Sequence, residues 1–187
     1  MNKPSGRQKP MSNTMFRMIS LTAAVFYKIM NLSSQLQKSG VHEGQTVLDF
    51  GCGSGHFTIA AARMVKDGGK VYALDIHPLA IEAVKKRVAK EGLPNVTTIL
   101  SDRDTGLSDE SVDIVLLYRT FYLVKDKQGL LDELHRVLKP RCILSVLGGG
   151  VADCLEAIEK DGRFSLEGRG KRFLNFRKVK ARNEGIG

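Results

Sequence analysis

Thr46–His56 reads TVLDFGCGSGH and decides the fold of this chain. Its early residues Val47 and Leu48 are typical of a buried β-strand, and the acid Asp49 follows them directly. Three glycines then come at alternate positions, namely Gly51, Gly53 and Gly55. Glycine lets a ligand lie against bare backbone, and a helix that begins at His56 would direct its free N–H groups at the same place. The stretch therefore predicts a nucleoside-cofactor site at the carboxyl end of a strand.

The spacing of these glycines differs from the dinucleotide fingerprint. That fingerprint is G-x-G-x-x-G, whereas here the third glycine follows the second by only two residues. Asp49 stands two residues before the loop, where it can reach a cationic group of a ligand. Ordinary turns also collect glycines, so the loop taken alone leaves a purely structural role open.

Two further predicted strands end in acids. Lys70–Asp75 predicts the second strand, and Asp75 lies about twenty residues beyond the loop, where Rossmann-like sites place an acid that accepts the ribose hydroxyls. Asp75 could also cap the next helix, near Pro78, either instead of binding the ribose or in addition to it. Val96–Leu100 predicts the third strand and brings Asp102 to the same edge of the sheet, where its carboxylate can accept from an adenine amino group.

At these positions the chain resembles the class I S-adenosylmethionine-dependent methyltransferases. The matching stretches are the first motif at Val47–Gly55, the second at Val71–Asp75, the adenine-contacting turn at Ser101–Arg103, the fourth strand at Val112–Tyr118 and the next helix and turn at Leu130–Pro140. The resemblance covers roughly residues 40–147. It is closest to the small-molecule branch typified by ubiquinone and menaquinone biosynthesis methyltransferases, from which Arg119–Tyr122 depart.

This resemblance implies S-adenosyl-L-methionine as the cofactor. The cofactor-binding residues that it implies are Asp49, Gly51, Cys52, Gly53, Gly55, Asp75, Ile76, Asp102, Arg103 and Tyr118. Within this set Asp49, Gly51 and Gly53 would surround the methionine part, and Asp75 would hold the ribose. Asp102 with Arg103 would hold the adenine end, and Tyr118 would lie close to the transferred methyl group.

No residue stands out as a catalytic base. An oxygen or nitrogen acceptor loses a proton around the time of transfer, and the candidates to take it are Tyr118, His56, Tyr122 and His135. His56 has an alternative role in the first turn of the loop helix, and His135 on a solvated helix face. A carbon or sulfur acceptor that is already nucleophilic needs no base, so the sequence leaves the catalytic residues unassigned.

The order of elements predicts an α/β fold with a Rossmann-like, doubly wound sheet of seven strands. A helix near residues 126–139 and a strand at Cys142–Leu147 follow the fourth strand. Phe164–Glu167 and Phe173–Arg177 then predict a hairpin with glycine in its turn. A hairpin at this place is what the resemblance to the methyltransferases implies, so the sheet is expected to be mostly parallel with an antiparallel C-terminal hairpin strand. A nicotinamide-binding fold would continue with another parallel crossover.

Length and composition fit one domain with an N-terminal cap. The chain has 187 residues and 42% hydrophobic content, which is enough to bury a core. We expect residues 1–13 to be disordered, residues 14–40 to form a helical cap and residues 41–187 to form the cofactor-binding domain. The cap carries apolar residues at helical spacing, namely Phe16, Ile19, Ala23, Phe26 and Met30. Its helix either packs into the core or, by the family resemblance, forms a lid over the cofactor crevice.

The cysteines indicate the redox environment of the protein, and the hydropathy indicates whether a segment spans a membrane. Cys52, Cys142 and Cys154 are an odd and sparse set without metal-ligand spacing, so they predict a reducing, cytoplasmic location and neither a disulfide framework nor a metal site. The small size of Cys52 accounts for its place in the loop. No run of about twenty apolar residues occurs, so no membrane span is expected.

Most of the net charge of +9 lies near the chain termini. Between Arg163 and Arg182 there are eight basic residues against Glu167 alone, which indicates either an anion-attracting patch or a solvated edge hairpin. The leading hypothesis is methyl transfer to a small molecule. An RNA or protein methyltransferase that uses the basic hairpin is the second, although Tyr118–Phe121 lack the Asn/Asp-Pro-Pro-aromatic signature that clamps a flipped base. A protein that binds the cofactor without catalysis is the third. The acceptor and the oligomeric state are left open.

Overall fold

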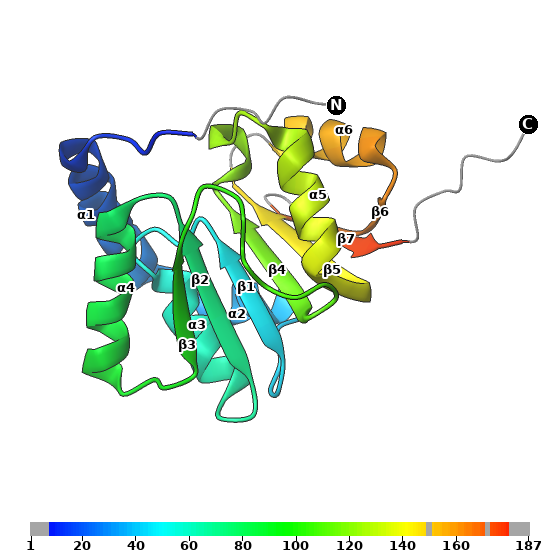
Figure 1. The fold of residues 1–187 in the computed structure, drawn as a ribbon. Coiled ribbons are helices and arrows are strands. Elements are labelled where there is room, and N and C mark those ends of the chain that lie inside the picture. The colour runs from blue at the N-terminus through cyan, green and yellow to red at the C-terminus, as the bar shows by residue number, and fades with distance from the viewer. Residues whose placement is uncertain (1–7, 149–150, 171–172, 180–187) are drawn as a thin grey trace, which may run out of the picture.

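The computed structural model describes residues 8–148, 151–170 and 173–179 and contains one seven-stranded sheet (Figure 1). The strands are β1 Thr46–Phe50, β2 Lys70–Asp75, β3 Val96–Leu100, β4 Val112–Tyr118, β5 Leu138–Leu147, β6 Phe164–Arg169 and β7 Phe173–Lys178. Their order across the sheet is β3-β2-β1-β4-β5-β7-β6. The first five strands pair in parallel, and β7 runs antiparallel to both of its neighbours. The predicted fold class is therefore confirmed.

Helices cover both faces of the sheet. They are α1 Asn13–Ile29, α2 Leu32–Lys38, α3 His56–Val65, α4 Pro78–Glu91, the 3-10 helix η1 Phe121–Leu123, α5 Lys127–Val137 and α6 Val151–Asp161. Successive strand residues point to opposite faces, so Val47 packs with α2 and α3 whereas Leu48 packs with α5 and α6. The near-continuous apolar runs of β1 and β4 follow from this burial on both sides.

The helix predicted near residues 126–139 ends earlier than expected. α5 stops at Val137, and Leu138 already pairs with Val112 as the first residue of β5. Proline has no backbone N–H and disfavours a helical residue before it, so Pro140 prevents the helix from continuing. The register shifts between Val112 and Ile114, and Arg141 there has a positive φ of 64°. The fifth strand is thus longer than the predicted Cys142–Leu147 and is irregular near its start.

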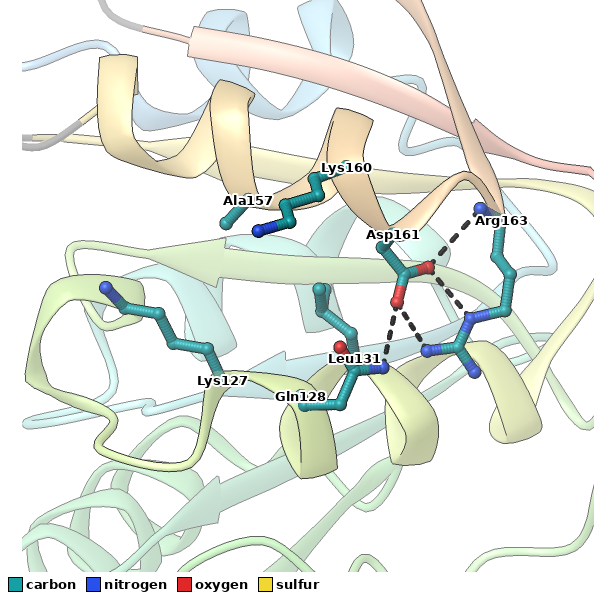
Figure 2. Close-up of a pocket in the computed structure, with 7 residues that line it drawn as sticks. All are labelled: Lys127, Gln128, Leu131, Ala157, Lys160, Asp161 and Arg163. Atoms are coloured by element: carbon teal, nitrogen blue, oxygen red, sulfur yellow. Dashed lines mark hydrogen bonds and ion pairs between the residues drawn. The ribbon is translucent and has the colours of Figure 1, made fainter.

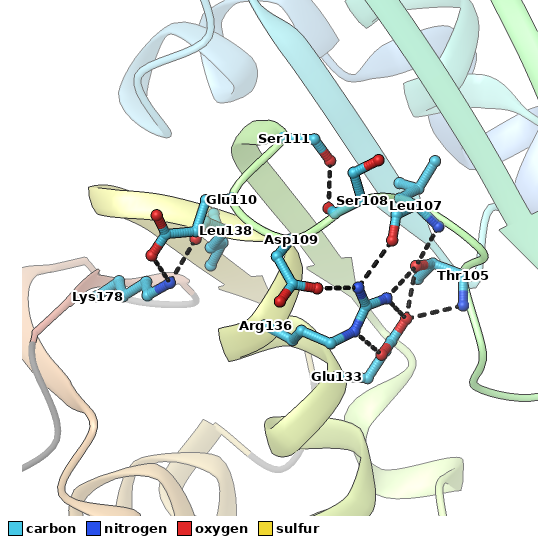
Figure 3. A network of polar contacts seen from close by, with 10 residues as sticks. All are labelled: Thr105, Leu107, Ser108, Asp109, Glu110, Ser111, Glu133, Arg136, Leu138 and Lys178. Carbon is cyan, nitrogen blue, oxygen red and sulfur yellow. Dashed lines mark hydrogen bonds and ion pairs between the residues drawn. The ribbon is translucent and has the colours of Figure 1, made fainter.

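A polar network attaches the loop that joins β3 and β4 to the helix α5 (Figure 3). Glu133 accepts hydrogen bonds from the backbone N–H of Thr105 at 2.9 Å and from its hydroxyl at 2.6 Å. Arg136 donates to Glu133 at 2.7 Å, to Asp109 at 2.6 Å and to the carbonyl of Leu107 at 2.8 Å. Burial alone would raise the pKa of Glu133, but the hydrogen bonds from Arg136 and Thr105 lower it to about 2. This ionised cluster holds the turn that follows β3.

The helices α1 and α2 fall in the segment predicted as a helical cap. Phe16 of α1 is buried and its ring stacks on that of His77, with centroids 4.4 Å apart. Ile19 and Phe26 remain 45% and 43% exposed, so the core-packing interpretation fits Phe16 but not these two residues. Within the described ranges, no helix combines the length and apolar character needed to cross a membrane. Of the segment predicted to be disordered, residues 1–7 lie outside the described residues.

Candidate active site

A crevice of about 840 Å³ opens where β1, β4 and β5 reach their carboxyl ends, beneath α1. The residues that line it are Ile19, Thr22, Ala23, Phe26, Tyr27 and Met30 from α1 and the turn after it, Asp49, Gly51, Cys52, Gly53, His56 and Phe57 from the end of β1 and the loop helix, and Tyr118, Arg119, Tyr122, Leu147 and Gly148 beyond β4 and β5. Open α/β sheets bind ligands at this edge.

Glycine is needed at the three positions of the loop for different reasons. All have positive φ values, of 81° at Gly51, 52° at Gly53 and 81° at Gly55. A β-carbon at Gly51 would lie 2.2 Å from the hydroxyl oxygen of Thr120, and one at Gly55 would lie 2.8 Å from a methyl group of Val84. At Gly53 a β-carbon would meet nothing within 4 Å. Gly51 and Gly55 therefore allow close packing, whereas Gly53 leaves open space that a ligand can use.

Asp49 is a buried carboxylate on the wall of the crevice. Its side chain is 2% exposed, and its Oδ2 accepts a hydrogen bond from the Thr58 hydroxyl at 2.6 Å. Burial raises the pKa of Asp49 to about 7, the hydrogen bond from Thr58 opposes the rise, and the nearby Asp75 adds to it. A cationic group beside this carboxylate would offset the cost of burying its charge. The donor set therefore fits a ligand that carries a positive charge.

We expect the affinity for a cationic cofactor to fall as the pH drops below about 7, because protonation of Asp49 removes the charge that attracts it. Calorimetric titrations with S-adenosylmethionine from pH 5.5 to 8.5 measure this. The stability of the ligand-free protein should change in the opposite direction and fall as the pH rises. A folded-state pKa of about 7 against the usual 3.8 means that stability present below pH 3.8 is lost as the pH rises to about 7.

Two variants test the assignment of this pH dependence. Asp49→Asn should flatten the affinity profile. Thr58→Val removes the hydrogen bond that opposes the rise in pKa, so it should move the midpoint to higher pH. An identical profile in wild-type and Asp49→Asn protein would show that another group titrates.

Asp75 connects the end of β2 to the glycine loop. Its Oδ2 accepts the backbone N–H of Gly53 at 2.9 Å, and its Oδ1 accepts that of His77 at 2.8 Å. His77, not Asp75, caps α4, since its Nδ1 accepts the N–H of Leu79 at 3.1 Å. The helix-capping alternative for Asp75 is therefore wrong. Each carboxylate oxygen has a second lone pair, which leaves acceptors for a diol.

The turn after β3 is engaged by the N-terminal segment. Asp102 Oδ2 accepts the backbone N–H of Gln8 at 2.9 Å, and the Gln8 side chain donates to the carbonyl of Leu123 at 2.9 Å. Arg103 points to α5, where it pairs with Asp126 at 2.6 Å. The expected adenine end of the site is thus covered by a segment from far away in the chain.

The structure places the predicted cofactor residues in two groups. Those that line the crevice are Asp49, Gly51, Cys52, Gly53 and Tyr118. Those that stand outside its lining are Gly55, Asp75, Ile76, Asp102 and Arg103. Asp75 joins the groups through its hydrogen bond to Gly53.

The Tyr118 hydroxyl is held inside the protein. It lies within hydrogen-bond distance of the Ser39 hydroxyl and 3.2 Å from that of Ser145. Burial raises the pKa of Tyr118 to about 12, although both hydrogen bonds oppose the rise. The hydroxyl is therefore neutral at physiological pH.

The other candidate bases are placed differently from one another. His56 lines the crevice, but its Nε2 lies 3.2 Å from the guanidinium of Arg87, and burial together with Arg87 lowers its pKa to about 4. His135 is half-buried rather than solvated, with its Nε2 3.3 Å from the carbonyl of Val179, away from the crevice. Tyr122 lines the crevice and is 51% exposed.

Several crevice residues were not predicted. Arg119, Gly148, Phe57 and Tyr27 reach it from four different parts of the chain. Arg119 and Gly148 directly follow β4 and β5. Their position at the carboxyl ends of these strands could have predicted their place in the site. Tyr27 comes from α1, and its place depends on how that helix lies over the sheet.

A second hollow, of about 480 Å³, lies between α5 and α6 (Figure 2). Its lining residues are Lys127, Gln128, Leu131, Ala157, Lys160, Asp161 and Arg163. Asp161 accepts hydrogen bonds from Arg163 at 2.5 Å and from Gln128 at 3.1 Å. None of the glycine-loop residues lines this hollow, so it is separate from the candidate site.

The basic hairpin is largely neutralised where the structure describes it. Arg163 pairs with Asp161, and Arg177 pairs with Glu167. Lys178 is 7% exposed and donates to a backbone carbonyl. Of the rest of the predicted patch, Arg169 is exposed, whereas Lys171, Arg172, Lys180 and Arg182 lie outside the described residues.

The sheet order, the glycine loop at the end of β1 and the acids at the ends of β1 and β2 define a Rossmann-like protein that binds a nucleoside cofactor. A family described as a methyltransferase domain matches residues 41–167, more than half of the chain. This chain belongs to the class I S-adenosylmethionine-dependent methyltransferases. The resemblance found in its motifs is confirmed.

Individual relatives agree with this family. Demethylmenaquinone methyltransferase of Geobacillus stearothermophilus is 34% identical over 65% of this chain and 49% of its own length. Arsenite methyltransferase of Halobacterium salinarum is 36% identical over 52% of this chain and 25% of its own length. The crystal structure of a SAM dependent methyltransferase from Aquifex aeolicus superposes with a TM-score of 0.76 at 26% identity, covering 90% of this chain and 98% of that one. The chain thus spans about half or less of the curated relatives it matches.

Proposed function

We propose that this protein transfers the methyl group of S-adenosylmethionine to a small-molecule acceptor. The observation that carries the proposal is the crevice of about 840 Å³, which has the glycine loop and Asp49 on one side and apolar and aromatic residues of α1 on the other. Its volume lies in the range of about 300–1,000 Å³ typical of small-molecule sites. The relatives named above act on small molecules according to their names, which supports the same class of acceptor.

The residues of the crevice fit this cofactor. Gly53 leaves space beside bare backbone, and the buried Asp49 favours a cation such as the amino group of the methionine part. We assign the ribose to Asp75 and the adenine end to Asp102, where the Gln8 segment would have to yield or share the carboxylate. When bound, S-adenosylmethionine supplies an electrophilic methyl group on a sulfonium.

The chain's own part in the reaction is positioning. Near-attack alignment of acceptor and methyl group can supply a large share of the rate enhancement, and the aromatic walls Phe26, Tyr27 and Tyr122 can align a planar acceptor. The helix α1 forms the roof of the crevice, so we interpret residues 14–40 as a cap over the domain formed by residues 41–187. We also propose a cytoplasmic location, which the free thiols of Cys52, Cys142 and Cys154 support.

The second candidate, an RNA or protein methyltransferase, has less support. The described basic residues of the hairpin are mostly ion-paired or buried, which leaves fewer cations for phosphates. A filter-binding assay with bulk RNA at rising salt should therefore show weak binding.

Calorimetry tests the proposed function. We expect S-adenosylmethionine and S-adenosylhomocysteine to bind with dissociation constants on the order of micromolar, about −8 kcal/mol, and NAD not to bind. A methyl-transfer screen with labelled donor against a cell extract should then place the label in the small-molecule fraction. Equal lack of response to all three ligands would refute the proposal, and label in macromolecules alone would favour the second candidate.

A further inference from the structure

Arg119 lines the crevice and has an unusual backbone conformation. It directly follows β4 and has a positive φ of 57°, a region that non-glycine residues rarely adopt. Its N–H donates to the carbonyl of Leu147 at 2.6 Å, which ties it to the end of β5. A β-carbon at Gly148 would lie 2.8 Å from Arg119 Cγ, so the glycine makes room for the arginine side chain. Strain of this kind persists where the surrounding structure imposes it and is common at functional sites.

The guanidinium of Arg119 lies among aromatic rings of the crevice. Its central carbon is 5.7 Å from the ring centroid of Phe26. It also lies close enough to the Tyr27 hydroxyl to oppose the rise that burial causes in the pKa of that group. The cation therefore stands beside an apolar, planar wall, on the side of the crevice formed by α1.

Arg119 differs from arginines that have structural partners. Arg103, Arg136 and Arg163 each pair with a carboxylate within 2.7 Å. Among the residues that the structure describes, no carboxylate forms an ion pair with Arg119. A strained arginine that lines the crevice and has no internal anion is available to a bound one.

We propose that Arg119 determines acceptor specificity by binding a planar acceptor as its anion, of the phenolate or carboxylate class. This rests on the proposed function. The negative oxygen lies against the guanidinium, and the planar body lies along Phe26 and Tyr27.

Such an acceptor removes the need for a base in the site. A lone pair of the anion forms the bond to the methyl carbon, and the carbon–sulfur bond breaks with its electron pair left on sulfur. The negative acceptor and the positive sulfonium both become neutral, and no proton has to be removed. This agrees with a crevice in which the Tyr118 hydroxyl is held by Ser39 and Ser145 and the His56 ring lies against Arg87. The neutral product loses its attraction to Arg119, which favours release.

The test uses the full chain saturated with S-adenosylhomocysteine, which carries no sulfonium charge, so that the effect of Arg119 is measured separately. The probe is 4-nitrophenol, whose anion is yellow, and nitrobenzene is the neutral control of similar shape. We expect the acid dissociation constant of the bound probe to be about tenfold larger than that of the free probe. The change is seen as added absorbance of the anion at constant pH. Nitrobenzene should bind more weakly.

Three variants complete the experiment. Arg119→Gln should abolish the added absorbance, and Arg119→Lys should retain part of it. Arg141→Gln is the matched control, because Arg141 is also exposed and has a positive φ of 64°, and it should behave as wild type. Calorimetry first establishes that each variant binds S-adenosylhomocysteine.

The outcomes separate the two proposals. If the wild type binds S-adenosylhomocysteine but shows no preference for the anion, or if Arg119→Gln ionises the probe as the wild type does, the role of Arg119 is refuted and the proposed function stands. If the wild type does not bind S-adenosylhomocysteine, the proposed function itself fails, and the proposal for Arg119 fails with it.

Discussion

Replacing Asp75 with alanine is expected to weaken binding of S-adenosylhomocysteine by about 100-fold, because two hydrogen bonds to a charged acceptor contribute about 3 kcal/mol together. The same carboxylate accepts the N–H groups of Gly53 and His77. The variant therefore loses both the proposed ribose contacts and the bond that holds the middle of the glycine loop. Isothermal calorimetry measures the affinity, and thermal unfolding measures the accompanying loss of stability.

Asp113→Ala is the matched control for this variant. Asp113 also accepts a backbone N–H, from Thr46 at 2.8 Å, and pairs with Lys139 at 2.6 Å, but it stands at the start of β4, the opposite edge of the sheet from the crevice. It should lower the melting temperature without changing affinity. A folded Asp75→Ala protein with wild-type affinity would contradict the assignment of Asp75 to the ribose.

Gly51→Ala is expected to destabilise the fold by about 3 kcal/mol, the sum of overpacking and of an unfavourable left-handed residue. The new methyl group would lie 2.2 Å from Thr120 Oγ1 and 2.5 Å from its Cγ2 at a φ of 81°. Chemical denaturation measures the change in the free energy of unfolding. Adding Thr120→Ala removes both of these atoms and should restore part of the stability.

Gly53→Ala separates the effect on the cofactor from the effect on the fold. Its methyl group would meet no protein atom within 4 Å, so the cost in stability should be about 1 kcal/mol, from the left-handed backbone alone. Because Gly53 lines the crevice, the same methyl group should still reduce cofactor affinity, by about tenfold or more. Equal losses of stability in the two alanine variants, or unchanged affinity in Gly53→Ala, would contradict these different roles.

The strands near the glycine loop were predicted within their observed bounds. β1 to β4 are short apolar runs bounded by glycine, proline or acids, and these local signals suffice to place them. The end of α5 was predicted too late, because the pairing of Leu138 with Val112 depends on a distant strand. The hairpin was predicted from the glycine in its turn, and the structure inserts β7 between β5 and β6.

The candidate site was predicted unevenly for the same reason. Asp49 and Gly53 lie within one continuous motif, so their shared place in the crevice follows from local sequence. Tyr118 was predicted as a possible base because the sequence does not reveal its contacts with the hydroxyls of Ser39 and Ser145, which belong to other parts of the fold. The sequence also gave no sign that Gln8 reaches Asp102, 94 residues away.

By itself, the sequence determined the backbone class, the cofactor family and the order of the loop residues, because short apolar runs and glycine dihedrals act over a few neighbouring positions. The tertiary structure alone decided which polar groups are paired and which remain available. It buried Asp49 beside Thr58 and engaged the Tyr118 hydroxyl in a hydrogen bond with Ser39. It left the Arg119 cation in the lining of the crevice. Charge and hydrogen bonding depend on neighbours brought together by packing across the whole chain, and no local pattern encodes those neighbours.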